Sequence, residues 1–337
     1  MRPVCFKGDS MQALSLLLEK DLSFTVGHRD VDAPVQSEVT IAVERAGLCG
    51  SDVHVLKTGA WVEYWPATLG HEVCGRVAVS HDTRFPVGTR VVVDSRMPQQ
   101  TKEGLSSANR LSPSLSWLGE ARPGGFSTHF NTSVVTLFTV PESLEPEVAV
   151  LAEPLAVVMC AMDSLDQTAV PLRVLILGYG PIGFLAHTEI RRRWNAEVTV
   201  IDPIESRLTL ASESGAITLT TLPSAEFDLV IDAAGYGKSL PDSMSVVRRG
   251  GQILLLALGH KETSLLPSDI VERGIRIVGS IGFENDHLSN SLKVLAMNPS
   301  EYRRVVSHVI PLAKFPEFYS SSEASSAHKI LINCEVN

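Results

Sequence analysis

Hydrophobic and polar residues alternate in the first part of the chain, from about residue 12 to residue 140. Residues 39–43 and 73–79 are clear examples, with a valine or isoleucine at nearly every second position. A period of two is typical of strands that bury one face. The pattern predicts a small β-barrel or β-sandwich for this half of the chain.

From residue 173 onward the pattern changes to continuous apolar runs separated by stretches with helical spacing. The runs are residues 174–177, 198–201, 229–231, 253–256 and 275–278. Strands of this kind are buried on both faces, as in a parallel sheet covered by helices. The second half is therefore predicted to be α/β, a doubly wound parallel sheet of the Rossmann type.

Residues 147–163 carry apolar side chains at helical spacing and are predicted to form one connecting helix that contains the hinge. From about residue 298 the chain again has a mixed strand and loop pattern, as in the first half. We expect one domain over residues 1–155 and 298–337 and a second over 156–297. Residues 94–122 are rich in Ser, Gln, Arg and Pro, which predicts a long surface excursion.

Composition excludes several classes of protein. The 337 residues are 44% hydrophobic and 20% charged, as in a globular chain of about two domains. A net charge of -9 argues against nucleic acid or an anionic membrane as a partner. No run of about 18 apolar residues occurs, and the five cysteines, at positions 5, 49, 74, 160 and 334, form no disulfide pattern. We expect a cytoplasmic protein.

A glycine-rich turn directly follows the first apolar run. Gly178, Gly180 and Gly183 form a GxGxxG motif, and with Pro181 and Ile182 they open a helix. In this context the glycines allow a tight turn, close approach of a pyrophosphate and packing of helix on strand. The motif predicts a dinucleotide site, although glycines that only close the turn would give the same pattern.

Four further residues complete the predicted cofactor site. Asp202, at the end of the second run, is expected to bind the ribose hydroxyls and to repel a 2′-phosphate, which favours NAD over NADP. Alternatively, it caps the next helix. Arg207 would soften that preference if it contacts the cofactor, and it is otherwise a solvated helix residue. Gly235 and Leu258 follow later runs and are also expected to contact the cofactor.

Zinc-binding residue types occur in two short strings of the first half. Cys49 lies in GLCGSDVH, and His71 and Glu72 lie in GHE. A thiolate, an imidazole and a carboxylate can hold zinc and leave one position open for a substrate. The separation of the two strings is not informative by itself.

These strings, the later PGGF at 123–126, AEPL at 152–155 and the GxGxxG motif occur in a familiar order. In this order they resemble the zinc-dependent medium-chain dehydrogenases over nearly the whole chain. The resemblance is greatest to the sorbitol, idonate and threonine dehydrogenase branch. It implies a GroES-like catalytic domain that precedes the Rossmann domain.

The resemblance also implies roles for individual residues. Cys49 and His71 fall on the ligands of one catalytic zinc, and either Glu72 or Glu153 supplies the carboxylate. Alternatively, Glu72 is a buried ion-pair partner behind the metal. Asp52 is expected to orient the imidazole of His71.

Two more residues of the first string are expected to handle the substrate proton. Ser51 matches the hydroxyl that binds the substrate oxygen, and His54 matches the outer end of a proton relay. A solvated surface histidine is the alternative for His54.

The chain departs from many family members in one segment. Residues 94–122 contain no cysteine, so a structural zinc is not expected there. Either packing of residues such as Leu111, Leu115, Trp117 and Leu118 holds this lobe instead, or the lobe is loosely ordered. We also expect a homodimer or homotetramer formed through the edge strand near residues 275–283.

The most direct interpretation is an NAD- and zinc-dependent dehydrogenase of a secondary alcohol, such as a polyol, sugar acid or cyclitol. An amino alcohol is also compatible with the sequence. One alternative is a zinc-independent reductase of ketones or alkenes. A second alternative is a catalytically silent member that serves as a scaffold or cofactor sensor.

Overall fold

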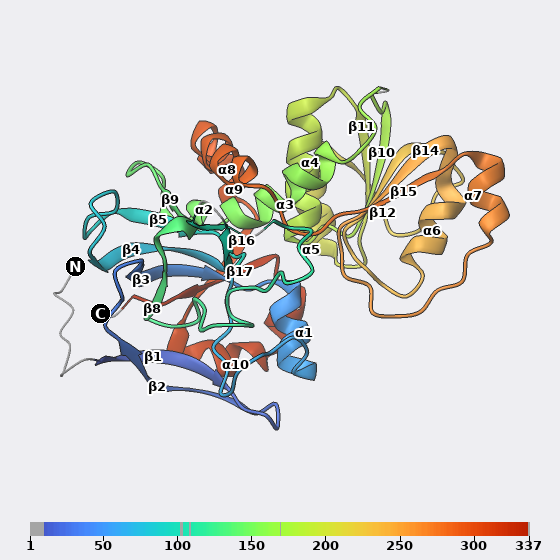
Figure 1. Ribbon diagram of the computed structural model, residues 1–337. Coiled ribbons are helices and arrows are strands. Elements are labelled where there is room, and N and C mark those ends of the chain that lie inside the picture. The colour runs from blue at the N-terminus through green and yellow to red at the C-terminus, as the bar shows by residue number, and fades with distance from the viewer. Residues whose placement is uncertain (1–9, 102–103, 108, 169, 336–337) are drawn as a thin grey trace. The chain divides into compact units, whose positions relative to one another are not determined.

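The computed structural model describes residues 10–101, 104–107, 109–168 and 170–335, and Cys5 lies outside them. The chain divides into two compact units. The first runs up to Glu153 and resumes at Glu284, and the second comprises Pro154–Phe283 (Figure 1). The second unit is thus an insertion in the sequence of the first.

The first unit is built on antiparallel β-structure. Its seven-stranded sheet has the order β16-β17-β3-β4-β5-β9, with β8 paired to β3. Two-stranded sheets are formed by β1 with β2 and by β6 with β7. The strands are β1 (Ser10–Leu18), β2 (Phe24–Asp32), β3 (Glu38–Gly47), β4 (Glu72–Ser80), β5 (Arg90–Val93), β6 (Pro98–Thr101), β7 (Gly104–Ser107), β8 (His129–Ser133), β9 (Leu137–Thr139), β16 (Val306–Pro311) and β17 (Lys329–Asn333).

Short helices connect these strands. They are α1 (Gly50–Thr58), η1 (Val134–Thr136), α2 (Pro146–Ala149), α8 (Asn285–Met297), α9 (Pro299–Arg303), η2 (Leu312–Lys314), α10 (Phe315–Tyr319) and α11 (Ser322–Ser326). The core is formed by the alternating side chains of the strands, among them Val39, Ile41 and Val43, together with Phe126 and Phe130. The period-two pattern therefore identified the buried face.

The second unit contains the predicted parallel sheet. Its six strands have the order β12-β11-β10-β13-β14-β15, and all of them pair in parallel (Figure 1). The strands are β10 (Arg173–Leu177), β11 (Glu197–Ile201), β12 (Ile217–Leu219), β13 (Phe227–Asp232), β14 (Val247–Leu255) and β15 (Arg276–Gly279). The helices are α3 (Ala152–Asp163), which begins in the first unit, α4 (Pro181–Arg193), α5 (Glu205–Glu213), α6 (Ser239–Val246) and α7 (Pro267–Arg273).

The structure confirms the fold class, and each of the five apolar runs lies wholly or largely within one strand. Two expectations differ from the structure. The single helix predicted over residues 147–163 is interrupted, because α2 ends at Ala149 and α3 begins at Ala152. The chain returns to the first unit at Glu284 and not near residue 298, because α8 contacts α2 and Ser291 Oγ donates to the Ala152 carbonyl (2.8 Å).

The packing predicted for the segment over residues 94–122 is found only in part. Leu118 is buried, but Leu111 is 66% exposed. The segment begins instead with a buried ion pair between Asp94 and Arg96 (2.6 Å). Arg96 also donates to Asn285 Oδ1 (2.5 Å) at the start of α8. The buried ion pair and the hydrogen bond to α8 therefore supply part of the anchoring that we expected from apolar packing.

Candidate metal centre and nucleotide site

The three proposed metal-binding side chains meet because of the register between β3 and β4. The strands are antiparallel, and Gly47 at the end of β3 is the partner of Glu72 at the start of β4. Cys49 follows β3 by two residues and is the N-cap of α1. His71 directly precedes β4. The two sequence strings thus meet where β3 ends and β4 begins.

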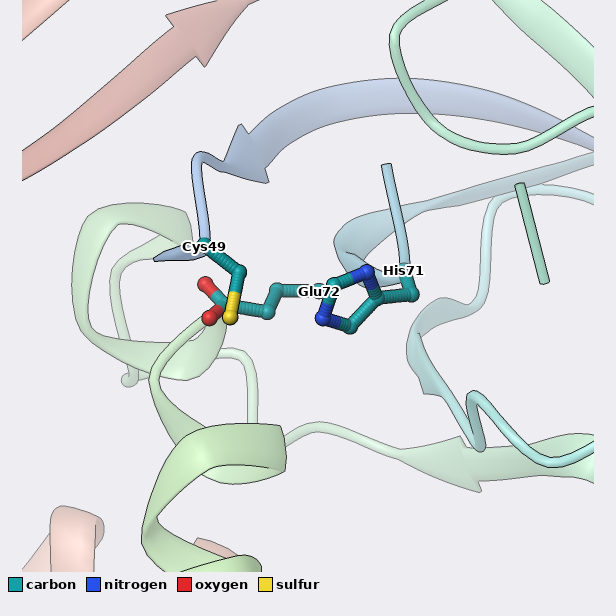
Figure 2. Close-up of side chains that lie close together, drawn as sticks. All are labelled: Cys49, His71 and Glu72. Atoms are coloured by element: carbon teal, nitrogen blue, oxygen red, sulfur yellow. The ribbon is translucent and has the colours of Figure 1, made fainter. Parts of the chain in front are cut away.

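Ligand atoms of Cys49, His71 and Glu72 all lie within 4.8 Å of one another. Figure 2 shows the Cys49 sulfur beside the Glu72 carboxylate, with the His71 ring next to both. A soft thiolate, an imidazole and one carboxylate are a donor set that suits zinc. The residues present therefore fit a single zinc ion.

Asp52 contacts the backbone of Cys49 and the side chain of His71. Its Oδ2 accepts a hydrogen bond from the backbone N–H of Cys49 (2.9 Å), and its Oδ1 lies 3.4 Å from His71 Nδ1. Burial alone would lower the pKa of His71, but the Asp52 carboxylate and the Cys49 thiol outweigh it and raise that pKa. Because Nδ1 faces Asp52, Nε2 is the nitrogen available to a metal.

Glu72 also has a second partner. It forms an ion pair with Lys329 at the start of β17, and each side chain is only 1% exposed. Lys329 Nζ donates in addition to the carbonyl oxygen of Leu48 (3.0 Å). Glu72 thus forms a buried ion pair and also lies in the group of side chains that could bind a metal.

Glu153 is not one of the three clustered side chains. It is buried near the start of α3, and its Oε1 accepts a hydrogen bond from Ser95 Oγ (2.7 Å). Burial raises the pKa of Glu153 to about 7; His71 opposes this effect and Glu72 reinforces it. A carboxyl group with this pKa exchanges protons readily at neutral pH.

The predicted proton-handling residues lie on α1. Ser51 is partly exposed in the first turn. The His54 ring is 5.0 Å from the ring of Trp61, centroid to centroid. Trp61 is itself 45% exposed and has a positive φ of 67°, which is uncommon for a bulky residue. His54 is therefore packed against an aromatic ring and is not an isolated surface histidine.

In the second unit, the GxGxxG turn joins β10 to α4. Gly180 is the N-cap of α4, Pro181 is its first residue and Ile182 follows. The side of Gly183 that would carry Cβ faces the carbonyl oxygen of Gly178, so any larger residue would overlap with it. The turn thus directs the helix N-terminus toward the carboxyl edge of the sheet, as a pyrophosphate site requires.

Asp202 follows β11 and contacts this turn. Its Oδ2 accepts from the backbone N–H of Tyr179 (2.7 Å), and its Oδ1 accepts from that of Ile204 (2.9 Å). Arg207 Nη1 lies 3.6 Å from the same carboxylate. Asp202 therefore bonds the N–H of Ile204, the residue before α5, and also fixes the glycine-rich turn.

Gly235 and Leu258 follow β13 and β14, and they lie beside one another. A Cβ at residue 235 would be 3.2 Å from the Leu258 carbonyl oxygen. Asp232 at the end of β13 accepts from the Gly235 N–H (2.9 Å). The predicted cofactor residues thus occupy the ends of the neighbouring strands β10, β11, β13 and β14.

Sequence reasoning missed three residues near the metal site. They are Lys329, Ser95 and Glu120, and burial raises the pKa of Glu120 to about 7. The only sequence feature that could have indicated Lys329 is its position as a single charged residue directly before the apolar run Ile330–Ile332. Ser95 and Glu120 lie in the polar segment 94–122, and no pattern distinguishes them there.

The fold and both sites define an oxidoreductase that combines a metal-binding β-domain with a nucleotide-binding Rossmann domain. Residues 35–142 match the family model described as alcohol dehydrogenase GroES-like domain, and residues 146–331 match that described as glucose dehydrogenase C-terminus. The chain belongs to the zinc-dependent medium-chain dehydrogenase family, in its polyol and threonine dehydrogenase branch.

Individual relatives agree with this assignment. D-altritol 5-dehydrogenase of Agrobacterium fabrum is 32% identical over 304 residues, which cover 85% of this chain and 89% of that protein. Sorbitol dehydrogenase of Bombyx mori is 26% identical, with 88% and 92% covered. The crystal structure of 2R,3R-butanediol dehydrogenase from Bacillus subtilis shares the fold at a TM-score of 0.85, with 24% identity and 95% and 99% of the chains covered.

Within the described part of the chain, none of the helices has both the length and the apolar composition needed to cross a membrane.

Proposed function

We propose that this chain oxidises a secondary alcohol and reduces the ketone in the reverse direction, with NAD as hydride carrier and one zinc ion. The observation that supports this most directly is the cluster of Cys49, His71 and Glu72 within 4.8 Å, held by Asp52. A silent scaffold would not require such a donor set, and neither would a zinc-independent reductase.

Zinc, when bound, supplies a Lewis acid that polarises the substrate oxygen. Cys49 Sγ and His71 Nε2 would hold it, with a carboxylate from Glu72 or Glu153. We propose that Ser51 Oγ takes up the proton of the substrate hydroxyl while it releases its own proton into a relay, and that His54 is the outer end of this relay, from which a proton reaches solvent. Asp52 keeps the His71 ring in the orientation that presents Nε2 to the metal.

In the second unit the glycine-rich turn and the N-terminus of α4 would bind the pyrophosphate of NAD. Asp202 would accept hydrogen bonds from the ribose hydroxyls while its negative charge disfavours a 2′-phosphate. Arg207, 3.6 Å from Asp202, would moderate that preference. Gly235 and Leu258 are proposed to contact the nicotinamide half, because they follow strands on the other side of β10 from β11.

The substrate class that we favour is a polyol, sugar acid or cyclitol. The relatives named as altritol and sorbitol dehydrogenases support a substrate with neighbouring hydroxyl groups. We also propose a homodimer or homotetramer formed through β15. This strand is an edge of its sheet, and the nearby Leu266, Val271 and Ile281 are exposed.

Metal analysis and one variant test the proposal. The purified chain should hold about one zinc and oxidise members of a polyol panel with NAD. Cys49→Ser should lose both zinc and turnover while NAD binding, measured by calorimetry, is retained. Cys160→Ser, a buried thiol outside the cluster, is the control and should retain zinc. A metal-free chain with full activity would refute the zinc-dependent mechanism.

A further inference from the structure

Glu120 places a further carboxyl group beside the candidate metal centre. Its side chain is half-buried, and within the described part of the chain it forms no hydrogen bond and no ion pair. The other carboxyl groups around the centre differ, because Asp52, Glu72 and Glu153 each have a hydrogen-bond or ion-pair partner. Among the described residues, the charge of Glu120 is therefore left without a direct partner.

Backbone contacts fix Glu120 next to the segment that carries His71. The backbone N–H of Glu63 donates to the Glu120 carbonyl oxygen (2.9 Å). Gly119 packs against the residue before His71, because a Cβ at position 119 would lie 3.0 Å from the backbone nitrogen of Gly70. All of these residues belong to the first unit. The position of Glu120 relative to His71 is therefore set by the fold of this unit alone.

The charges of the metal centre act on the Glu120 carboxyl group. Burial raises the pKa of Glu120 to about 7; the charge of His71 opposes this effect, and the charges of Asp52 and Glu63 reinforce it. Glu120 is not one of the three side chains whose ligand atoms cluster at the metal position. Its charge therefore reaches the surroundings of the metal centre although the residue lies outside the clustered ligand set.

We propose that Glu120 selects substrates by charge, so that it favours an amino-substituted polyol or cyclitol and disfavours a sugar acid. This inference rests on the proposed function and narrows its substrate class. A partly desolvated carboxylate without a cation is unfavourable, and an ammonium group on the substrate would supply that cation. A carboxylate on the substrate would instead add a like charge, and repulsion is stronger there than in bulk water. A neutral polyol lies between the two, because its hydroxyl groups donate hydrogen bonds but carry no charge.

Three ligands that differ only at one terminal carbon test this selection. D-Glucamine carries an ammonium group there, D-glucitol a hydroxyl group and D-gluconate a carboxylate. Their dissociation constants are measured by calorimetry on the zinc-loaded full chain with NADH, so that binding is observed without turnover. At about pH 8 the Glu120 carboxyl is mostly ionised. The natural chain should then bind D-glucamine at least about tenfold more tightly than D-glucitol, and D-glucitol at least about tenfold more tightly than D-gluconate.

Glu120→Gln removes the charge and keeps the shape and the hydrogen-bonding capacity of the side chain. The ratio of the D-gluconate to the D-glucamine dissociation constant should fall at least about tenfold in this variant, with NADH affinity unchanged. Glu63→Gln is the matched control, because the Glu63 side chain is exposed and solvent screens its charge. It should change the ratio less than about threefold. If Glu120→Gln does not fold, Glu120→Ser carries the same prediction, because serine is uncharged and smaller.

Three results would overturn the inference. They are a natural chain that binds D-glucamine no more tightly than D-glucitol, a ratio that the neutral variant leaves unchanged, and equal changes of the ratio in Glu63→Gln and Glu120→Gln. Zinc content and NAD-linked turnover of the polyol panel test the proposed function separately. An active zinc enzyme whose binding ignores ligand charge would refute only the role of Glu120.

Discussion

His187 lies beneath the nucleotide-binding turn and makes the stability of the second unit depend on pH. It is 1% exposed on α4, and its Nδ1 is 2.8 Å from the hydroxyl of Tyr179, which is fully buried. Burial, and secondarily the charge of Arg191, lowers the pKa of His187 to about 4. The native structure therefore holds a neutral imidazole at a pH where the unfolded chain is protonated.

The size of the change in unfolding free energy follows from the pKa values of His187 in the folded and unfolded states. The unfolded histidine has a pKa near 6.5 and the folded one near 4, and each unit corresponds to about 1.4 kcal/mol. Above pH 6.5 both states are neutral and the stability is unaffected. As the pH falls from 6.5 to 4 the unfolded state binds more protons, so the stability falls by about 3 kcal/mol in total. About 2 kcal/mol of this loss should occur between pH 7 and pH 5.

The assay compares urea unfolding of the natural chain and His187→Gln at pH 7 and at pH 5. Glutamine can still accept the Tyr179 hydroxyl proton but does not titrate in this range. The natural chain should lose about 2 kcal/mol more than the variant between the two pH values. His81→Gln, at an exposed histidine, is the control and should behave like the natural chain. An identical pH-dependent loss in the natural chain and His187→Gln would refute this reasoning.

Three further predictions concern the cofactor site and the segment over residues 94–122. Asp202→Ala should weaken NAD binding more than NADP binding, and an unaltered ratio of dissociation constants would exclude Asp202 from cofactor selection. Gly183→Ala should lower NAD affinity at least about tenfold, because its Cβ would overlap with the Gly178 carbonyl; normal affinity by calorimetry would contradict this. Arg96→Met should cost about 3–5 kcal/mol of unfolding free energy, because it leaves the buried Asp94 carboxylate without a positively charged partner. Arg84→Met, at an exposed pair with Asp82, should cost less than about 1 kcal/mol, and equal losses in the two arginine variants would argue against the buried pair as an anchor.

Local patterns were sufficient to predict most of the fold. The apolar runs that became β10, β11, β13, β14 and β15 alternate with stretches of helical spacing, and this alternation is typical of a parallel sheet covered by helices. Helix α8 was assigned to the wrong unit because its sequence encodes an amphipathic helix but not the surface on which it packs. The strand β12 was missed because it is short and only partly apolar, so it produces no clear periodic pattern.

The candidate metal site was only partly accessible from the sequence. Cys49, His71 and Glu72 could be named because they lie in short strings typical of a family. The partners that set their charge could not, since Lys329 and Ser95 come from distant segments and contact Glu72 and Glu153 only after folding. Long-range pairing of this kind leaves no periodic trace in the sequence.

The position of β17 has a consequence for the synthesis of this protein. Leu48 and Lys329 are 281 residues apart, and the whole Rossmann unit is translated between them. While the nascent chain is still on the ribosome, Glu72 has no ammonium to neutralise it, so the first half of the barrel cannot close around a compensated core. Completion of the sheet around β17 must therefore await the last strand, which makes this unit the later of the two to mature.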